Sequence, residues 1–254
     1  MLGWFSNRIF LEAAQRRLIR RGVPIFAYHK IAEPTAGTRD PFLYVSPKRF
    51  NEQLLALRRA GLISEMLDEI GQFETSAGRA IITFDDGFAS ALRNGLEILA
   101  RHQFRAIQFL VAGSLGKQND WDVAKGDVPE PLMDEAQIRD WLAAGHHIGS
   151  HSLTHRNLRH LNPAEMREEI FASKKLLEDR FGIEVQHFCY PYGSWNQTVR
   201  ELVIESGYRT ACTLEFGVND TNTPAHELRR IYPLSSGEML RKIAHRLTRR
   251  FFCQ

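Results

Sequence analysis

Two aspartates and two histidines in this sequence have a spacing suited to metal chemistry. Asp85 and Asp86 stand side by side after the apolar run AIITF, and His151 and His155 are four residues apart in SHSLTH. Adjacent carboxylates at the end of a buried strand repel each other and lose solvation, so some other interaction must compensate. Asp-Gly is also a common turn between strands, and on this stretch alone both interpretations stay open.

The histidine pair has donor chemistry suited to zinc and similar divalent ions, which bind histidine nitrogen and carboxylate oxygen. A His-x3-His pair alone is a weak signal that surface helices also carry by chance. Ser152, Leu153 and Thr154 fill the interval, so the metalloprotease motif H-E-x-x-H is excluded. With Asp86 as a third ligand, the site would leave positions open for water and substrate.

Short β-branched or aromatic runs alternate with helical patterns along the chain, and this alternation predicts a parallel sheet, closed into a barrel or doubly wound. Segment 113–133 interrupts the pattern and is predicted to be a long loop over one face, as functional loops often are. The predicted strands are 23–29, 80–86, 105–112, 147–151, 184–192 and 209–214, and the predicted helices are 46–61, 88–102, 134–145, 162–181 and 195–207.

Polar residues gather where the predicted strands end. These residues are His29 on the first strand, Asp85 and Asp86 on the second, His151 on the fourth and the segment 190–192 on the fifth. The carboxyl ends of parallel strands are where α/β folds build their active sites. The coincidence favours a metal site over a simple turn.

Four motifs together resemble the polysaccharide deacetylases, carbohydrate esterase family 4. They are TFDDG (83–87), HSLTH (151–155), FCYPYG (188–193) and LRRI (228–231). The stretches PIFAYHKI, YVSPKRFNEQLLAL, GHHIGSH and SKKLLE also resemble that family in the expected order, so that the resemblance covers roughly residues 24 to 233. It implies a single-domain α/β fold, a distorted (β/α) barrel, that removes N- or O-acetyl groups from sugars with the help of a metal.

The resemblance also implies residue roles. Asp86, His151 and His155 would bind a divalent metal ion, with Zn²⁺ expected and Co²⁺, Ni²⁺ or Mn²⁺ as alternatives. Asp85 would be the general base, and Tyr192 would offer its backbone N–H to the oxyanion. The chemistry agrees, because such a site needs an activated water, a proton acceptor and a fixed donor.

Two departures from the family pattern need substitutes. Cys189 stands where many members carry an arginine that orients the catalytic aspartate, and we expect Arg230 in RRIYP to replace it; the alternative is an ordinary surface arginine. The late Leu-x-His acid motif is missing, and His245 in Ile-Ala-His matches it only loosely. His29 is the better candidate general acid and resembles the Tyr-His of exopolysaccharide deacetylases, with a satisfied core histidine as the alternative.

Three tryptophans lie near these motifs or within a predicted helix. Trp121 and Trp195 have flat apolar faces that would suit stacking on sugar rings, although packing is the commoner use of such side chains. Trp141 has helical spacing with Ile138 and Leu142 and is predicted to be core.

The net charge of +3 over 254 residues hides two basic ends. Residues 1–22 carry five arginines against one glutamate, and residues 236–254 carry five lysines and arginines against one glutamate. We predict a basic amphipathic extension at each end of a catalytic domain at 23–235, either lying on an anionic membrane surface or docking on the domain. The acidic middle lacks any nucleic-acid motif, which excludes nucleic acid as a partner.

The sequence predicts a cytoplasmic protein, peripheral at the inner membrane face if the basic ends bind lipid. No signal peptide or apolar stretch of membrane-spanning length is present, and the three cysteines form no paired framework. The expected activity is metal-dependent removal of an N-acetyl group from an N-acetylated sugar or glycan, including a lipid-linked one. The alternatives are a deformylase of a lipid-linked aminosugar, another linear or cyclic amide hydrolase, or a glycan-binding relative without activity.

Overall fold

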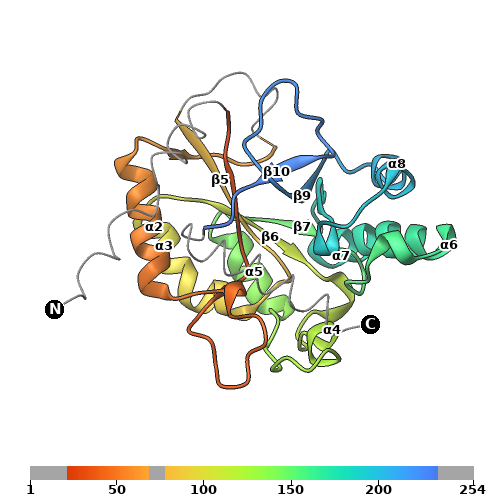
Figure 1. Ribbon diagram of the computed structural model, residues 1–254, viewed down its shortest axis with the longest axis horizontal. Helices are drawn as coiled ribbons and strands as arrows, with labels where there is room; N and C mark the ends of the chain where they lie inside the picture. The colour runs from red at the N-terminus through yellow and green to blue at the C-terminus, as the bar shows by residue number, and fades with distance from the viewer. Residues whose placement is uncertain (1–21, 69–77, 234–254) are drawn as a thin grey trace, which may run out of the picture.

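Parallel strands run around the centre of the molecule, and helices cover them on the outside (Figure 1). The structure is a computed structural model and describes residues 22–68 and 78–233. Each hydrogen-bonded strand pair in the central sheet is parallel. The strands follow in the order β1 (Ile25–Tyr28), β5 (Arg79–Phe84), β6 (Ala106–Leu110), β7 (His147–Ser150), β8 (His187–Cys189), β9 (Thr210–Phe216) and β10 (Leu228–Arg230). A short strand, β4 (Ile63–Ser64), pairs with the first two residues of β5.

The first and last strands of this order meet and nearly close the sheet into a barrel. Ile231 follows β10 and forms a parallel bridge with Phe26 on β1. The backbone N–H of Ala27 donates to the Ile231 carbonyl at 3.0 Å, and the N–H of Ile231 donates to the Ile25 carbonyl at 2.8 Å. The predicted distorted (β/α) barrel is therefore confirmed. Strand β10 was not predicted, because a three-residue Leu-Arg-Arg segment has no apolar run to indicate it.

Alternation along the strands decides which side chains enter the barrel. Ile81, Cys212 and Leu228 belong to a small buried cluster distinct from the larger core formed with the helices. Because successive strand residues point to opposite faces, Thr83 shares the face of Ile81, and Arg230 shares the face of Leu228. The barrel interior thus changes from apolar to polar toward the carboxyl ends of its strands.

The helices begin where capping residues predict them. Ser46 accepts a hydrogen bond from the Arg49 N–H at the start of α2 (Pro47–Arg59). Asn162 and Glu165 form a reciprocal capping box at α6 (Pro163–Arg167). Such caps satisfy N–H groups that lack partners within the helix. The remaining longer helices are α3 (Leu96–Arg101), α5 (Glu135–Ala143), α7 (Ser173–Phe181) and α8 (Gln197–Glu205).

Two predicted helices contain a wider π turn and are therefore less regular than expected. One π turn, at Ala91–Gly95, precedes α3, and the other, at Glu168–Ala172, separates α6 from α7. Figure 1 shows α2 and α3 side by side on one flank of the barrel, with α6, α7 and α8 on the opposite flank.

The predicted long loop 113–133 contains one short helix, α4 (Asp120–Val123). Its end is tied to the segment after β5, since the Met133 N–H donates to the Gly87 carbonyl at 2.8 Å and the Ala89 N–H donates to the Pro131 carbonyl at 3.0 Å. A second small sheet pairs β2 (Lys30–Ile31) with β3 (Tyr44–Val45). Both features lie next to the residues that follow β1 and β5, where the candidate site is found.

Apart from Gly22, the predicted basic extensions 1–22 and 236–254 lie outside the described residues, as does His245. The limits 23–235 of the catalytic domain stay a prediction. Within the described parts of the chain, no helix has the length and apolar character needed to cross a membrane.

Candidate active site

The carboxyl ends of the barrel strands bring all seven predicted site residues together. Asp85 and Asp86 follow β5, His151 and His155 follow β7, and Tyr192 follows β8. Arg230 ends β10, and His29 follows β1. Their roles stay predictions, but their convergence from five separate strands gives those roles a common place.

Asp86, His151 and His155 form a buried group whose ligand atoms lie within 4.8 Å of one another. The Nε2 atoms of His151 and His155 approach the same oxygen, Asp86 Oδ1, at 3.4 and 3.2 Å. Asp86 Oδ1 is buried, and although both nitrogens are close to it, it has no hydrogen-bond partner. A buried carboxylate oxygen without a hydrogen bond, facing two imidazole nitrogens, fits a divalent cation between them.

The other ring nitrogen of each histidine is occupied, which fixes the ring. His151 Nδ1 lies 2.8 Å from the Cys189 carbonyl, which can only accept, so this nitrogen carries the proton and Nε2 is free to act as a ligand. His155 Nδ1 lies 3.0 Å from Tyr192 Oη, and the Trp121 ring stacks on His155 at a centroid distance of 4.5 Å. Groups that contact the ring nitrogen not used for the metal, here called outer partners, orient metal-binding histidines.

Backbone conformations that side chains rarely adopt are concentrated at this site. Five non-glycine residues of the described chain have positive φ, and four of them are Asp86, Ser152, His155 and Tyr192. Left-handed backbone costs free energy for residues with a Cβ and persists only where the surroundings impose it. The loops after β5, β7 and β8 are therefore held in conformations that aim these side chains at one point.

Asp85 forms a two-point ion pair with Arg230. The Arg230 Nη1 and Nη2 atoms donate to Asp85 Oδ1 and Oδ2, both at 2.7 Å, and the Arg230 side chain is completely buried. Its burial excludes the surface-arginine alternative. Arg230 Nη2 also lies 3.1 Å from Cys189 Sγ, so the guanidinium of β10 fills the space beside the small cysteine of β8.

The two aspartates are held ionised for different reasons. Burial alone would raise the pKa of each carboxyl group. The Arg230 guanidinium more than offsets burial and lowers the pKa of Asp85. His151 and His155 hold the pKa of Asp86 well below its usual range. Asp85 is thus a carboxylate able to take a proton, and Asp86 a carboxylate able to bind a cation.

The two histidines differ in the direction of their shifts. Burial lowers the pKa of His155, which favours the neutral ring that a metal requires. For His151, burial is outweighed by Cys189 and Asp86, which raise the pKa well above its ordinary value. A cation would bind the neutral imidazole, so protonation and metal binding compete at His151.

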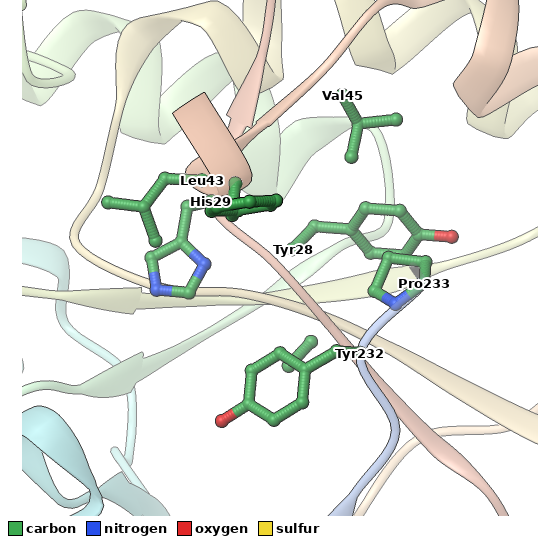
Figure 2. A pocket seen from close by; sticks show the side chains of 8 residues that line it. Tyr28, His29, Leu43, Val45, Tyr232 and Pro233 are labelled. Carbon is green, nitrogen blue, oxygen red and sulfur yellow. The ribbon is translucent and has the colours of Figure 1, made fainter. Parts of the chain in front are cut away.

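His29 lines a pocket together with Tyr28, Leu43, Val45, Tyr232 and Pro233 (Figure 2). Its Nε2 lies 3.8 Å from Asp85 Oδ2, and its side chain is 15% exposed. Among the described residues that line this pocket, His29 is the one histidine. The position suits a proton donor close to the base, and the role of His29 as general acid stays a prediction.

The tryptophans pack against protein groups. Trp195 stacks on Tyr190 at a centroid distance of 5.9 Å, and Trp141 is completely buried, as predicted. Sequence reasoning missed Lys125, whose Nζ donates to Tyr192 Oη at 2.7 Å and lies 4.4 Å from the centre of its ring. No local motif indicates this lysine, because only the fold brings loop 113–133 against Tyr192.

The carboxyl ends of this parallel barrel, where such folds build their active sites, hold an arginine-paired carboxylate beside a group of two histidines and one aspartate. The family model described as "Polysaccharide deacetylase" matches residues 73–211. The chain belongs to the polysaccharide deacetylase family.

Among similar proteins, YxkH of Bacillus subtilis is 24% identical over 214 residues, which are 82% of this chain and 70% of YxkH. The peptidoglycan-N-acetylglucosamine deacetylase PgdA of Listeria monocytogenes is 28% identical over 126 residues, 49% of this chain and only 24% of PgdA. The structure of the Streptococcus pyogenes deacetylase PplD in complex with acetate matches with a TM-score of 0.72 and 21% identity, covering 87% of this chain and 97% of that one. At this identity the structural likeness is evidence for the fold.

Proposed function

We propose that this protein is a metal-dependent hydrolase that removes the N-acetyl group from an N-acetylated sugar or glycan. The observation that carries the proposal is the group Asp86, His151 and His155, with an unpartnered carboxylate oxygen at its centre, beside the Asp85–Arg230 pair. Family membership and the deacetylase relatives support the same reaction.

The metal ligands would be Asp86 Oδ1 and the Nε2 atoms of His151 and His155. A cation bound there supplies acidity to a water molecule and polarises the acyl oxygen. Zinc is the ion that this donor set favours, and Co²⁺, Ni²⁺ or Mn²⁺ suit similar ligands.

The chain's own groups would move the protons and hold the substrate oxygen. Asp85, kept ionised by Arg230, accepts the proton of the attacking water. The Tyr192 backbone N–H, at the first turn after β8, donates to the developing negative charge on the acyl oxygen. His29, beside Asp85, donates a proton to the departing amine.

The substrate class to test first is a glycan containing N-acetylglucosamine, since the PgdA relative is named for that sugar. A lipid-linked sugar belongs in the same panel, although it has no support among the described residues. Metal-loaded protein is incubated with N-acetylated oligosaccharides, peptidoglycan fragments, nucleotide sugars, lipid-linked sugars and formylated aminosugars. Both acetate and formate are measured.

The expected result is acetate release that Asp85→Asn abolishes. Formate release from formylated aminosugars would replace the acetyl specificity with the deformylase alternative. If no substrate releases either acid with any of the four metal ions, the proposed activity is wrong.

A further inference from the structure

A buried carboxylate that the proposed reaction does not use lies behind the loop that carries both histidines, here called the histidine loop (residues 151–155). Glu169 is 4% exposed and belongs to the π turn between α6 and α7. A buried carboxylate is costly unless hydrogen bonds satisfy its oxygens. Single π turns inside helices are frequent at functional sites. Its partners therefore indicate what it does.

Both oxygens of Glu169 accept hydrogen bonds from the middle of the histidine loop. Oε2 accepts from the backbone N–H groups of Leu153 and Thr154, at 3.0 and 2.9 Å, and Oε1 accepts from the Thr154 hydroxyl. Hydrogen bonds to an ionised acceptor are stronger than those between neutral groups. The carboxylate thus holds the chain between the two metal-ligand candidates.

The same helical segment also holds the start of the loop. Ser173 Oγ lies 2.8 Å from Ser150 Oγ, and Ser150 directly precedes His151. Within the loop, the His155 N–H donates to Ser152 Oγ at 3.0 Å. Ser152 and His155 both have positive φ, so the loop stores conformational strain that its surroundings must balance.

We propose that Glu169 is a positioning residue for His155. Its hydrogen bonds hold the histidine loop in the strained conformation that points both Nε2 atoms at Asp86 Oδ1. The inference rests on the proposed function in that these residues form a metal site. The hydrogen bonds of Glu169 go to Leu153 and Thr154, so it acts through the backbone between the two histidines.

The test measures metal affinity without substrate. Chelator-treated protein is titrated with Zn²⁺ against a competing chromophoric chelator, and with Co²⁺ by its visible absorption. Glu169→Ala is expected to lower the affinity about 10- to 100-fold, as loss of an outer partner of a metal ligand does. Glu168→Ala, an exposed neighbour on the same π turn, is the matched control and should leave the affinity unchanged.

Glu169→Gln separates hydrogen bonding from charge. Its amide oxygen can accept from both backbone N–H groups, and its NH₂ group can donate to the Thr154 hydroxyl. We expect its affinity to stay within about threefold of the unaltered protein, because the loop contacts are preserved. Thr154→Val removes one contact and keeps Glu169, so it tests the proposal even if Glu169→Ala does not fold; we expect a loss of about two- to fivefold.

Two results would overturn the proposal. One is a folded Glu169→Ala protein with a lower melting temperature but the metal affinity of the unaltered protein, since that is a structural role alone. The other is a loss in Glu169→Gln as large as in Glu169→Ala, since hydrogen bonding would then not be the cause. Unaltered protein that binds metal but releases no acetate would refute the proposed function and leave this inference standing.

Discussion

Histidines and an aspartate gather at both edges of the barrel, but the two groups differ in how their ring nitrogens are used. At the amino ends of β7 and β8, His147 Nδ1 and His187 Nε2 lie 3.2 and 3.9 Å from Asp68 Oδ1. His146 Nδ1 accepts a hydrogen bond from the Ala106 N–H at 3.1 Å. Within the described residues, the groups able to hold a metal ion all lie at the carboxyl ends of the strands.

The difference lies in what the backbone does around each group. Histidines at the amino ends sit in or beside regular strands, and burial lowers the pKa of His146 and His187 to about 4. The rings of these two histidines form hydrogen bonds that stabilise the fold. At the carboxyl ends, positive φ values at Ser152 and His155 turn the chain so that two Nε2 atoms converge. Residue type supplies the candidate ligands, and the strained loop backbone brings them together.

Substituting the aspartates at the two edges of the barrel should give the largest differences in turnover and metal content. Asp85→Asn should lower turnover about 100- to 10,000-fold while metal content is retained, because it removes a base. Asp86→Asn should lose both metal and turnover. Asp68→Asn, at the opposite edge, should change neither. Elemental analysis together with acetate release checks this, and equal metal content in the Asp85 and Asp86 variants would contradict the assignment of roles.

The histidines of the two edges should separate in the same way. His155→Ala should lower the metal affinity of chelator-treated protein by more than about 100-fold, since a ligand matters more than an outer partner. His187→Ala should leave that affinity unchanged and destabilise the fold by about 1–3 kcal/mol. Metal titration and chemical unfolding measure the two quantities. A similar loss of metal affinity in both variants would show that the edges are not distinct.

Arg230→Gln tests the buried ion pair at the catalytic edge. Breaking a buried pair should cost about 3–5 kcal/mol of stability. Arg230 lowers the pKa of Asp85, so its loss should raise that pKa and move the acid limb of the activity profile to higher pH. The pair's contribution to stability is present above the ordinary aspartate pKa and is lost as the pH falls through the lowered one. An unchanged acid limb would remove Asp85 as the base.

The smallest expected effect concerns the outer partners of the histidines. Tyr192→Phe removes the hydroxyl beside His155 Nδ1 and should weaken metal binding about tenfold. Thr210→Val removes the hydroxyl 2.9 Å from His187 Nδ1 and should leave metal binding as it is. Competition with a chelator of known affinity resolves a tenfold change. Equal affinities for the two variants would mean that Tyr192 does not orient His155.

Much of this site was predictable from the sequence, because its parts are local. The adjacent aspartates after a strand, the histidines four residues apart and the strand-helix alternation are all patterns within short windows. These patterns predicted a parallel α/β sheet and the candidate ligands, and the family resemblance favoured a barrel over a doubly wound sheet. The caps at Ser46 and Asn162 are local too, and they begin their helices where the sequence predicts.

Only the tertiary structure decided which distant residues complete the site. Arg230 reaches Asp85 across 145 positions of sequence, and the sequence alone left it between an orienting arginine and a surface one. Glu169 and Lys125 carry no motif, since acidic and basic residues on helices and loops are usually solvated. Their contacts with Tyr192 and the histidine loop form when separate segments pack together, and neither local propensity nor residue spacing predicts such contacts. The sequence determined what could bind a metal, and packing decided what holds those ligands in place.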